Sequence, residues 1–312
     1  MKFLITGAAG YIGSNIINRL TKQDAEIIGL YHINKPNIDH KSVQYIKADL
    51  SQPSFINCLP DNIDIIIHCA ALMRDFGSKL KFYKVSVEGT KKIISWAHDN
   101  NVSQFIHLGH IPYESSHRFN YYSETKKEIE WILLDKIKKN NAPITIIRPG
   151  NVFGPGAPVW LIRIISIIKK NNLYLIDHGK GIFHHTYIQN LIDAIVLCLG
   201  NKKAIGTSFD ITDGDDTITF QKYFSDIALM LGKSTDFRNI SKKSALRVGT
   251  AMLYLNKFTR IKPIITPLAT EILTNQQNIS IKKAQNLLNY NPKVTYLKAM
   301  DEIEQWIKKT YN

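Results

Sequence analysis

The sequence has little cysteine, no long apolar run and a shortage of acidic residues. Its three cysteines, Cys58, Cys69 and Cys198, stand far apart in apolar segments, which argues against a disulfide framework or a zinc site. Its apolar runs stop well short of the roughly 20 residues that a membrane-spanning helix needs. The first apolar segment leads directly into a glycine loop, without the parts of a signal peptide. We therefore expect a cytoplasmic protein with no stable membrane insertion and no bound metal.

The shortage of acidic residues leaves a formal net charge of +14, from 40 basic and 26 acidic side chains. Most lysines are scattered or end predicted helices, as in segments 136–141 and 167–172, where they complement the helix dipole and stay in water. This distribution differs from the basic stripe of a nucleic-acid-binding protein. The expected partner is a small-molecule substrate, with a homodimer left open and no nucleic acid expected.

Short β-branched runs alternate with amphipathic helical segments through the first half of the chain. The runs lie at residues 2–6, 26–31, 43–47, 63–69, 104–108 and 143–149. Such a pattern indicates a parallel sheet covered on both faces, which is a doubly wound α/β fold. From about Gly150 onward longer helices dominate, which predicts a smaller, mainly helical lobe.

Three glycines, Gly7, Gly10 and Gly13, follow the first predicted strand and open a helix that begins near Tyr11 and Ile12. Glycine at these positions permits a tight turn, close approach of the backbone to a pyrophosphate and close packing of the helix on the strand. The helix N-terminus adds free N–H donors for the anion. The motif predicts a dinucleotide-binding, Rossmann-type domain over residues 1–150 and a substrate-binding lobe over 151–312, with an interleaved boundary.

Tyr122 and Lys126 lie four residues apart in a helical pattern, so they share one face of the helix. A phenol has an ordinary pKa of about 10, and a nearby cation stabilises its phenolate, which allows proton transfer near neutral pH. The same ammonium can hold the ribose of a nicotinamide cofactor. The pair is therefore a candidate acid–base system.

Together these motifs resemble the extended short-chain dehydrogenase/reductase superfamily and, within it, the NAD-dependent epimerase/dehydratase family. The resemblance rests on TGAAGYIG (6–13), the YxxxK spacing of Tyr122 and Lys126, and segments 85–90, 148–156 and 279–292, and it covers nearly the whole chain. It implies hydride transfer at a secondary alcohol or ketone, with Tyr122 as the acid/base.

The resemblance also implies further contacts with NAD or NADP. These contacts come from residues that follow the predicted strands: Asp49, Leu50, Ala70, Ala71, Pro149 and Val152. The second strand lacks the terminal carboxylate that usually accepts a hydrogen bond from the ribose of NAD. His32 and Lys35 stand there instead and suit a 2′-phosphate, so we expect a mild preference for NADP.

The sequence departs from the family pattern at two catalytic positions. After the fifth strand, where the family has a serine or threonine that contacts the carbonyl oxygen, this chain has His110. We favour His110 as the hydrogen-bond donor, because imidazole can polarise a carbonyl. Ser115 or Ser116 as the donor, or an impaired site, stay open as alternatives. Ser86 replaces the family's asparagine in segment 85–90.

The substrate is less well defined. Segment 181–190 lacks the arginine that holds the diphosphate in sugar-nucleotide enzymes, and its histidines, with His178, lack a further ligand to complete a metal site. The first interpretation is an oxidoreductase or epimerase/dehydratase acting on a nucleotide sugar. The alternative is a reductase of an apolar ketone, similar to hydroxysteroid dehydrogenases or dihydroflavonol reductases. A third is a non-catalytic dinucleotide sensor or scaffold.

Segment 244–258 combines apolar residues with upstream lysines. Such a segment can be an interfacial helix, a lid over the substrate or a subunit contact. We expect a lid or a subunit contact.

Overall fold

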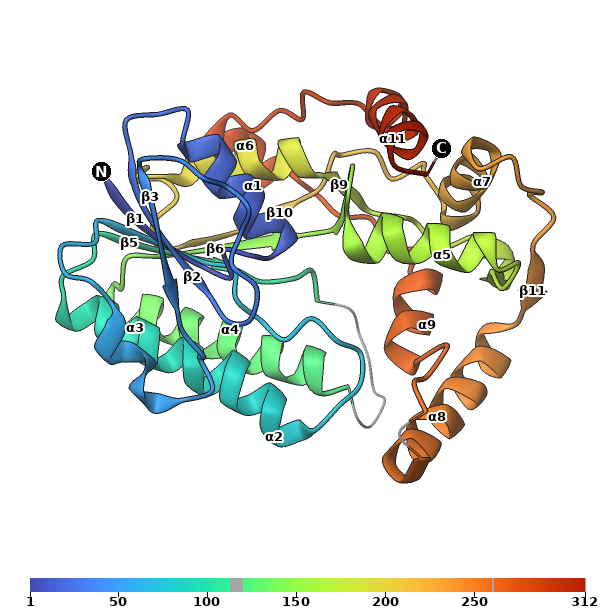
Figure 1. Cartoon of the computed structure of the whole chain (residues 1–312), viewed down its shortest axis with the longest axis horizontal. Coiled ribbons are helices and arrows are strands. Elements are labelled where there is room, and N and C mark those ends of the chain that lie inside the picture. Colours follow the sequence, from blue (N-terminus) through green and yellow to red (C-terminus); the bar gives the residue numbers. More distant parts are fainter. Residues whose placement is uncertain (113–119, 260, 312) are drawn as a thin grey trace.

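A seven-stranded parallel sheet forms the centre of the computed structural model, which describes residues 1–112, 120–259 and 261–311 (Figure 1). The strand order is β10-β6-β5-β4-β1-β2-β3. The strands are β1 (Lys2–Thr6), β2 (Glu26–Tyr31), β3 (Val43–Lys47), β4 (Ile65–His68), β5 (Gln104–Leu108), β6 (Ile144–Pro149) and β10 (Thr207–Ile211). The predicted doubly wound fold is therefore confirmed.

The buried strands pack helices on both faces because neighbouring side chains point to opposite sides. Ile5 packs into the core under α1 (Tyr11–Leu20) and α6 (Ile188–Cys198), whereas Leu4 belongs to the core under α3 (Gly89–Asp99) and α4 (Tyr121–Asn140). Figure 1 shows these two helical layers above and below the sheet.

The chain leaves the sheet after β6 and returns to it once, at β10, which pairs with β6. This return mixes the two halves of the chain in space, and the division at residue 150 stays a prediction. The remaining elements are α2 (Lys79–Phe82), β7 (Asn151–Phe153), α5 (Arg163–Lys169), β8 (Tyr174–Ile176), β9 (His185–Tyr187), α7 (Phe220–Met230), β11 (Arg238–Ile240), α8 (Lys242–Thr259), α9 (Pro267–Thr274), α10 (Lys282–Leu288) and α11 (Tyr296–Tyr311).

Aromatic rings build the centre of the lobe. Phe183 stacks on Tyr223 with ring centroids 4.0 Å apart, and Phe153 meets both Phe183 and Tyr223 edge to face. Beyond this core, α8 and α9 form a helical hairpin that projects at the lower right of Figure 1. In the described part of the chain, none of the helices combines the length and apolar character needed to cross a membrane.

Candidate active site

The glycine loop between β1 and α1 is tightly folded. Gly7 has a φ of +70°, and its carbonyl oxygen accepts a 2.8 Å hydrogen bond from the Gly10 N–H. A Cβ on Gly13 would lie only 2.3 Å from that oxygen, so only glycine fits there. Gly10 precedes the first turn of α1, which begins at Tyr11 and receives no side-chain cap. The turn thus fits the pyrophosphate of a dinucleotide, which can accept hydrogen bonds from the N–H groups of Tyr11, Ile12 and Gly13.

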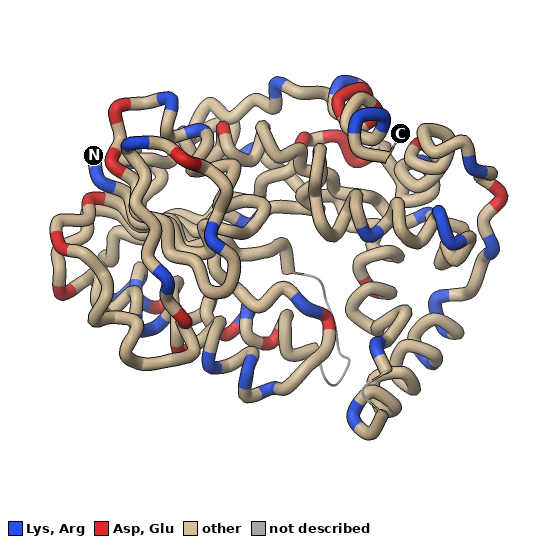
Figure 2. Tube along the Cα trace, viewed as in Figure 1, with Lys and Arg blue, Asp and Glu red and all other residues tan. Residues whose placement is uncertain are grey.

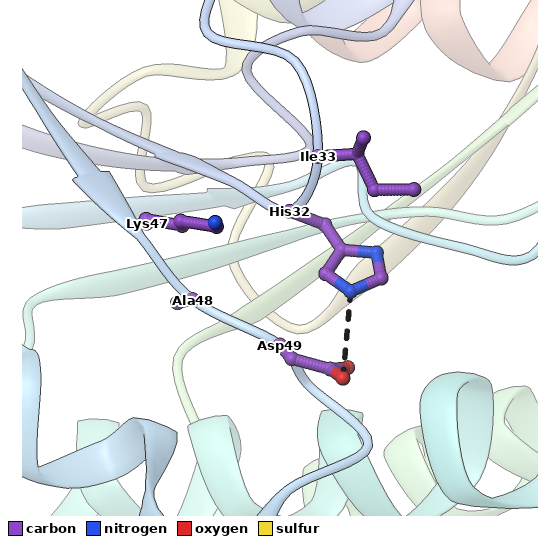
Figure 3. A pocket seen from close by; sticks show the side chains of 5 residues that line it. All are labelled: His32, Ile33, Lys47, Ala48 and Asp49. Atoms are coloured by element: carbon purple, nitrogen blue, oxygen red, sulfur yellow. Dashed lines mark ion pairs between the residues drawn. The ribbon is translucent and has the colours of Figure 1, made fainter.

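A shallow pocket of about 430 Å³ opens at the carboxyl ends of β2 and β3 (Figure 3). His32, Ile33, Lys47, Ala48 and Asp49 line it. In a doubly wound sheet, ligands bind beyond the carboxyl ends of the strands, near the glycine loop. The position suits the adenosine end of a dinucleotide.

Within this pocket His32 Nε2 lies 3.4 Å from Asp49 Oδ2 (Figure 3). Burial works to raise the pKa of Asp49, but hydrogen bonds from Ser51 and the charge of His32 outweigh it and lower that pKa. Asp49 is therefore an ionised hydrogen-bond acceptor. Lys47, which sequence reasoning missed, brings an ammonium group to the pocket, and its place at the end of β3 was the available signal.

The other predicted cofactor residues lie in three different settings. Lys35 is outside the lining of the pocket, with its Nζ 5.7 Å from the centroid of the Tyr45 ring. Leu50 is buried after β3, and Ala70 and Ala71 are half-buried after β4. Pro149 ends β6, and Val152 lies in β7, which follows directly.

Tyr122 lies in the first turn of α4. Asn120 begins this helix, and its side-chain oxygen accepts a 3.2 Å hydrogen bond from the Ser123 N–H, which fixes the turn. Burial raises the pKa of Tyr122 to about 12. The phenol consequently keeps its proton at neutral pH and is suited to donate it.

Lys126 is buried one turn further along α4, with only 6% of its surface exposed. Its Nζ donates a 2.7 Å hydrogen bond to the Leu108 carbonyl at the end of β5, a partner that the sequence did not predict. Burial lowers the pKa of Lys126 to about 8, although Cys69 and Glu130 act in the opposite direction. An ammonium has three N–H donors, so two remain for the phenol and the cofactor.

One further turn along α4, Glu130 is anchored to the sheet. Arg148 on β6 donates to Glu130 through Nε at 2.8 Å and also bonds Asp210 on β10 at 3.2 Å. This network ties α4 to two strands, and it therefore fixes the direction in which Lys126 points.

His110, which we expect to be the carbonyl donor, lies beside Tyr122. The two rings meet edge to face with centroids 5.6 Å apart. Both ring nitrogens of His110 are buried, and neither has a hydrogen-bond partner among the described residues. Burial and the charge of Lys126 lower the pKa of His110 to about 3, so the imidazole is neutral and has an N–H to donate. Ser115 and Ser116 lie outside the described residues.

A buried hydrogen-bonded chain that the sequence did not reveal supports the loop after β4. Thr90 donates to the Ser86 carbonyl, so its Oγ1 accepts from Nε2 of His68 at 2.9 Å. Nδ1 of His68 then accepts from the Thr6 hydroxyl at 2.8 Å, and the Thr6 oxygen accepts from the Ala70 N–H at 3.1 Å. Burial lowers the pKa of His68 to about 3, in accord with this neutral form. This series of hydrogen bonds fixes the backbone of Ala70.

His107 on β5 stacks against His68, with ring centroids 5.6 Å apart. Both of its nitrogens are buried without a partner among the described residues. Burial, followed by the charge of Lys126, holds the pKa of His107 well below its ordinary value. The charge of Lys126 thus acts to lower the pKa of three buried histidines, His68, His107 and His110.

Three cations of the substrate lobe contact nearby side chains. Arg163 lies 3.7 Å from Asp75, Arg238 donates to the Tyr174 hydroxyl at 3.0 Å, and Lys242 pairs with Glu271 at 2.9 Å.

The lobe histidines serve packing and hydrogen bonding. His184 contacts the Gln277 carbonyl at 2.6 Å, His185 contacts Asp213 at 2.8 Å, and His178 lies 3.4 Å from the Asn239 side chain. Within residues 1–112, 120–259 and 261–311, no group of three or more metal-binding side chains is placed to hold an ion.

Comparison with known proteins agrees with this geometry. The model of the NAD dependent epimerase/dehydratase family matches residues 3–212, more than half of the chain. The chain belongs to this family, and it is an enzyme of the short-chain dehydrogenase/reductase type.

Two kinds of protein, steroid or sterol dehydrogenases and a nucleotide-sugar epimerase, are similar to this chain over nearly its whole length. A 3-beta-hydroxysteroid dehydrogenase of Mycolicibacterium neoaurum is 23% identical over 96% of this chain and 90% of its own. A decarboxylating sterol-4-alpha-carboxylate 3-dehydrogenase of Mus musculus is 24% identical over 97% and 90%. The UDP-glucuronic acid 4-epimerase of Bacillus cereus, solved with UDP-glucuronic acid and NAD, has a TM-score of 0.75 at 22% identity, with both chains fully covered. The similarity to the epimerase structure shows that the two proteins share a fold.

Proposed function

We propose that this enzyme interconverts a ketone and a secondary alcohol on a largely apolar substrate, with NAD or NADP as the hydride carrier. The observation that carries the proposal concerns three cations of the lobe: Arg163, Arg238 and Lys242 already contact Asp75, Tyr174 and Glu271. The family's diphosphate-binding arginine is also missing from segment 181–190. The full-length likeness to two sterol-type dehydrogenases supports the same substrate class.

The proposed chemistry assigns one step to each of three residues. When bound, the dinucleotide exchanges a hydride at its nicotinamide ring. In the reducing direction Tyr122 donates its phenolic proton to the carbonyl oxygen as the alcohol forms. The Lys126 ammonium stabilises the resulting phenolate, and the neutral His110 N–H donates a hydrogen bond to the same oxygen.

Burial favours the reducing direction. Because the pKa of Tyr122 is raised to about 12, its protonated form predominates at neutral pH and serves as the acid. Oxidation would need the phenolate as a base, and this costs more in a buried site. The neighbouring positions of Tyr122, Lys126 and His110 favour an enzyme over a non-catalytic sensor.

We also propose a mild preference for NADP. No carboxylate ends β2, and His32 and Lys47 bring an imidazole and an ammonium group to the pocket. Asp49 opposes this preference, since its carboxylate lies 3.4 Å from His32 and is suited to a ribose hydroxyl. The expected difference is consequently small. A homodimer and a cytoplasmic location stay predictions.

A substrate panel with two tyrosine variants tests the proposed function. NADH and NADPH oxidation would be followed with 3-ketosteroids, and epimerisation or oxidation would be followed with UDP-sugars. We expect turnover of a ketosteroid, a loss of roughly 10²–10⁴-fold in Tyr122→Phe and normal dinucleotide affinity in that variant. The adjacent Tyr121→Phe is the matched control and should keep its turnover.

Three other results would contradict the proposal. Turnover of UDP-sugars alone would assign a nucleotide-sugar enzyme. Intact dinucleotide binding without turnover of either class would point to a sensor. Full ketosteroid turnover by Tyr122→Phe would refute the assignment of the acid.

A further inference from the structure

One face of the α8–α9 hairpin is apolar and lies open to solvent. Val248, Ala251, Leu255 and Phe258 follow one another on α8 at spacings of three, four and three residues, which puts them on the same face. Ile261 and Ile264, further along the chain, are also exposed. The hairpin stripe, as we name it, comprises Val248, Ala251, Leu255, Phe258, Ile261 and Ile264. Phe258 is 85% exposed and Ile264 is 77% exposed.

The hairpin stripe is not the inner face of a poorly packed helix. The opposite face of α8 buries Ala245, Gly249 and Leu253. A Cβ on Gly249 would lie 3.0 Å from the backbone of Thr266 at the start of α9, so the two elements are in close contact. The helix is therefore held by its own buried face, and the exposed face is free to meet another surface.

Basic residues predominate around the hairpin stripe, although one of them, Lys242, pairs with Glu271 on α9 at 2.9 Å. Between Phe237 and Thr270 the sequence has no aspartate or glutamate but seven basic residues: Arg238, Lys242, Lys243, Arg247, Lys257, Arg260 and Lys262. Figure 2 shows basic positions along α8 and no acidic ones. An apolar face bordered by cations is the composition of a helix that lies in the interface of an anionic bilayer.

The observations favour a lipid surface over the lid or subunit contact that the sequence favoured. A lid would bury its apolar face against the cofactor half, whereas here that face is exposed. If a second copy of the protein docked on the stripe, the basic residues of one copy would face those of the other, and like charges at an interface oppose association. We propose that the hairpin stripe docks the enzyme peripherally on an anionic membrane.

Docking at the hairpin would also place the junction of the two halves near the lipid. Thr266, at the start of α9, donates a 3.3 Å hydrogen bond to Asp75 in the loop after β4. Met73, two residues earlier in that loop, is 63% exposed. The loop that Thr266 contacts thus also carries an exposed apolar side chain. The docking proposal does not depend on the substrate class.

Vesicle flotation with the full chain tests the docking. The probes are phosphatidylcholine vesicles with and without phosphatidylserine, at low and high salt. We expect flotation with the anionic vesicles only, reduced by salt, and a loss of about tenfold or more in Leu255→Ser/Phe258→Ser. The matched control is Leu229→Ser/Leu297→Ser, which removes two similarly exposed leucines elsewhere (66% and 70% exposed) and should float like the wild type.

Three results would overturn the proposal. One is wild-type protein that does not float with either vesicle. Another is equal loss in both double variants. The third is a dimer formed through the stripe. If sedimentation shows a dimer that only Leu255→Ser/Phe258→Ser dissociates, and no vesicle binding, the occupant of the stripe is a second copy. Dinucleotide titration of each variant reports folding separately from ketone turnover, so failure of the docking is distinct from failure of the proposed function.

Discussion

The glycine loop and the α8–α9 hairpin differ in the space that they leave for side chains. In the loop a single added carbon on Gly13 would lie 2.3 Å from a carbonyl oxygen, whereas in the hairpin a whole Phe258 ring is 85% exposed. The loop is defined by backbone geometry and tolerates almost no added atom. The hairpin is defined by surface composition. Substitutions in the glycine loop should accordingly abolish cofactor binding, whereas substitutions in the hairpin should change only the association of the protein with other surfaces.

The largest expected effect is at Gly10. A glutamate there would place a carboxylate in the space for the pyrophosphate, and its Cβ would already lie 3.1 Å from the Gly7 oxygen. We expect Gly10→Glu to abolish NADH binding in a fluorescence titration, because the like charges repel.

The same charge placed on the hairpin is the control. Ala251→Glu should leave NADH affinity unchanged, because Ala251 is exposed on α8. Unchanged NADH binding in Gly10→Glu would show that the loop does not hold the dinucleotide.

Lys126→Ala should have the next largest effect. Removing the buried ammonium takes a donor from the cofactor and the stabilising charge from the phenolate, so affinity and turnover should fall together, the latter by roughly 10²–10⁴-fold. The pH optimum of alcohol oxidation should move to higher pH. Lys127→Ala, at an exposed neighbouring residue, is the control and should behave like the wild type. If Lys126→Ala lost only dinucleotide affinity or only turnover, the role of Lys126 in both would be contradicted.

The wild-type enzyme should show the matching pH dependence. With a pKa of about 8, Lys126 is charged below that pH and neutral above it. Ketone reduction should therefore be fastest below about pH 8 and fall as the pH rises through this value, and the fall should be absent in Lys126→Ala. A wild-type rate of reduction that stays level to well above pH 8 would contradict the pKa assigned to Lys126.

The sequence predicted the sheet more fully than the surroundings of the site. β1, β2, β3 and β5 begin and end where the apolar runs do. For β1, β2 and β5 the reason is that buried parallel strands have no polar alternation to blur their ends, whereas β3 is a partly exposed edge strand. β10 was missed, since TSFDI at 207–211 is short, partly polar and paired with a strand about 60 residues away.

Local spacing explains which parts of the site could be predicted. Tyr122 and Lys126 are one helical turn apart, so sequence alone predicts their shared face. The hydrogen bonds of His68 join it to Thr6 and Thr90, which are 62 and 22 residues away. Only the register of β1 against β4 and the packing of α3 bring these three together, and neither follows from local pattern.

His110→Ala tests the replacement of the family's hydroxyl. Loss of one hydrogen-bond donor to a developing oxyanion costs about 10²–10³-fold in turnover, and we expect a decrease in this range with unchanged dinucleotide affinity. His98→Ala, at a side chain that is 85% exposed, is the control. Normal turnover in His110→Ala would move the role to Ser115 or Ser116.

The smallest expected effect is the choice between NAD and NADP. Calorimetry should show NADP binding more tightly than NAD by less than about tenfold, a difference of under about 1.4 kcal/mol. His32→Glu should reverse the order, because a carboxylate after β2 would accept from the ribose hydroxyl and repel a 2′-phosphate. His98→Glu adds the same charge at a remote, exposed position and should change neither affinity. If the wild type binds NAD equally well or more tightly, the 3.4 Å pair of His32 and Asp49 gives the reason, since Asp49 then takes the ribose hydroxyl and His32 orients its carboxylate.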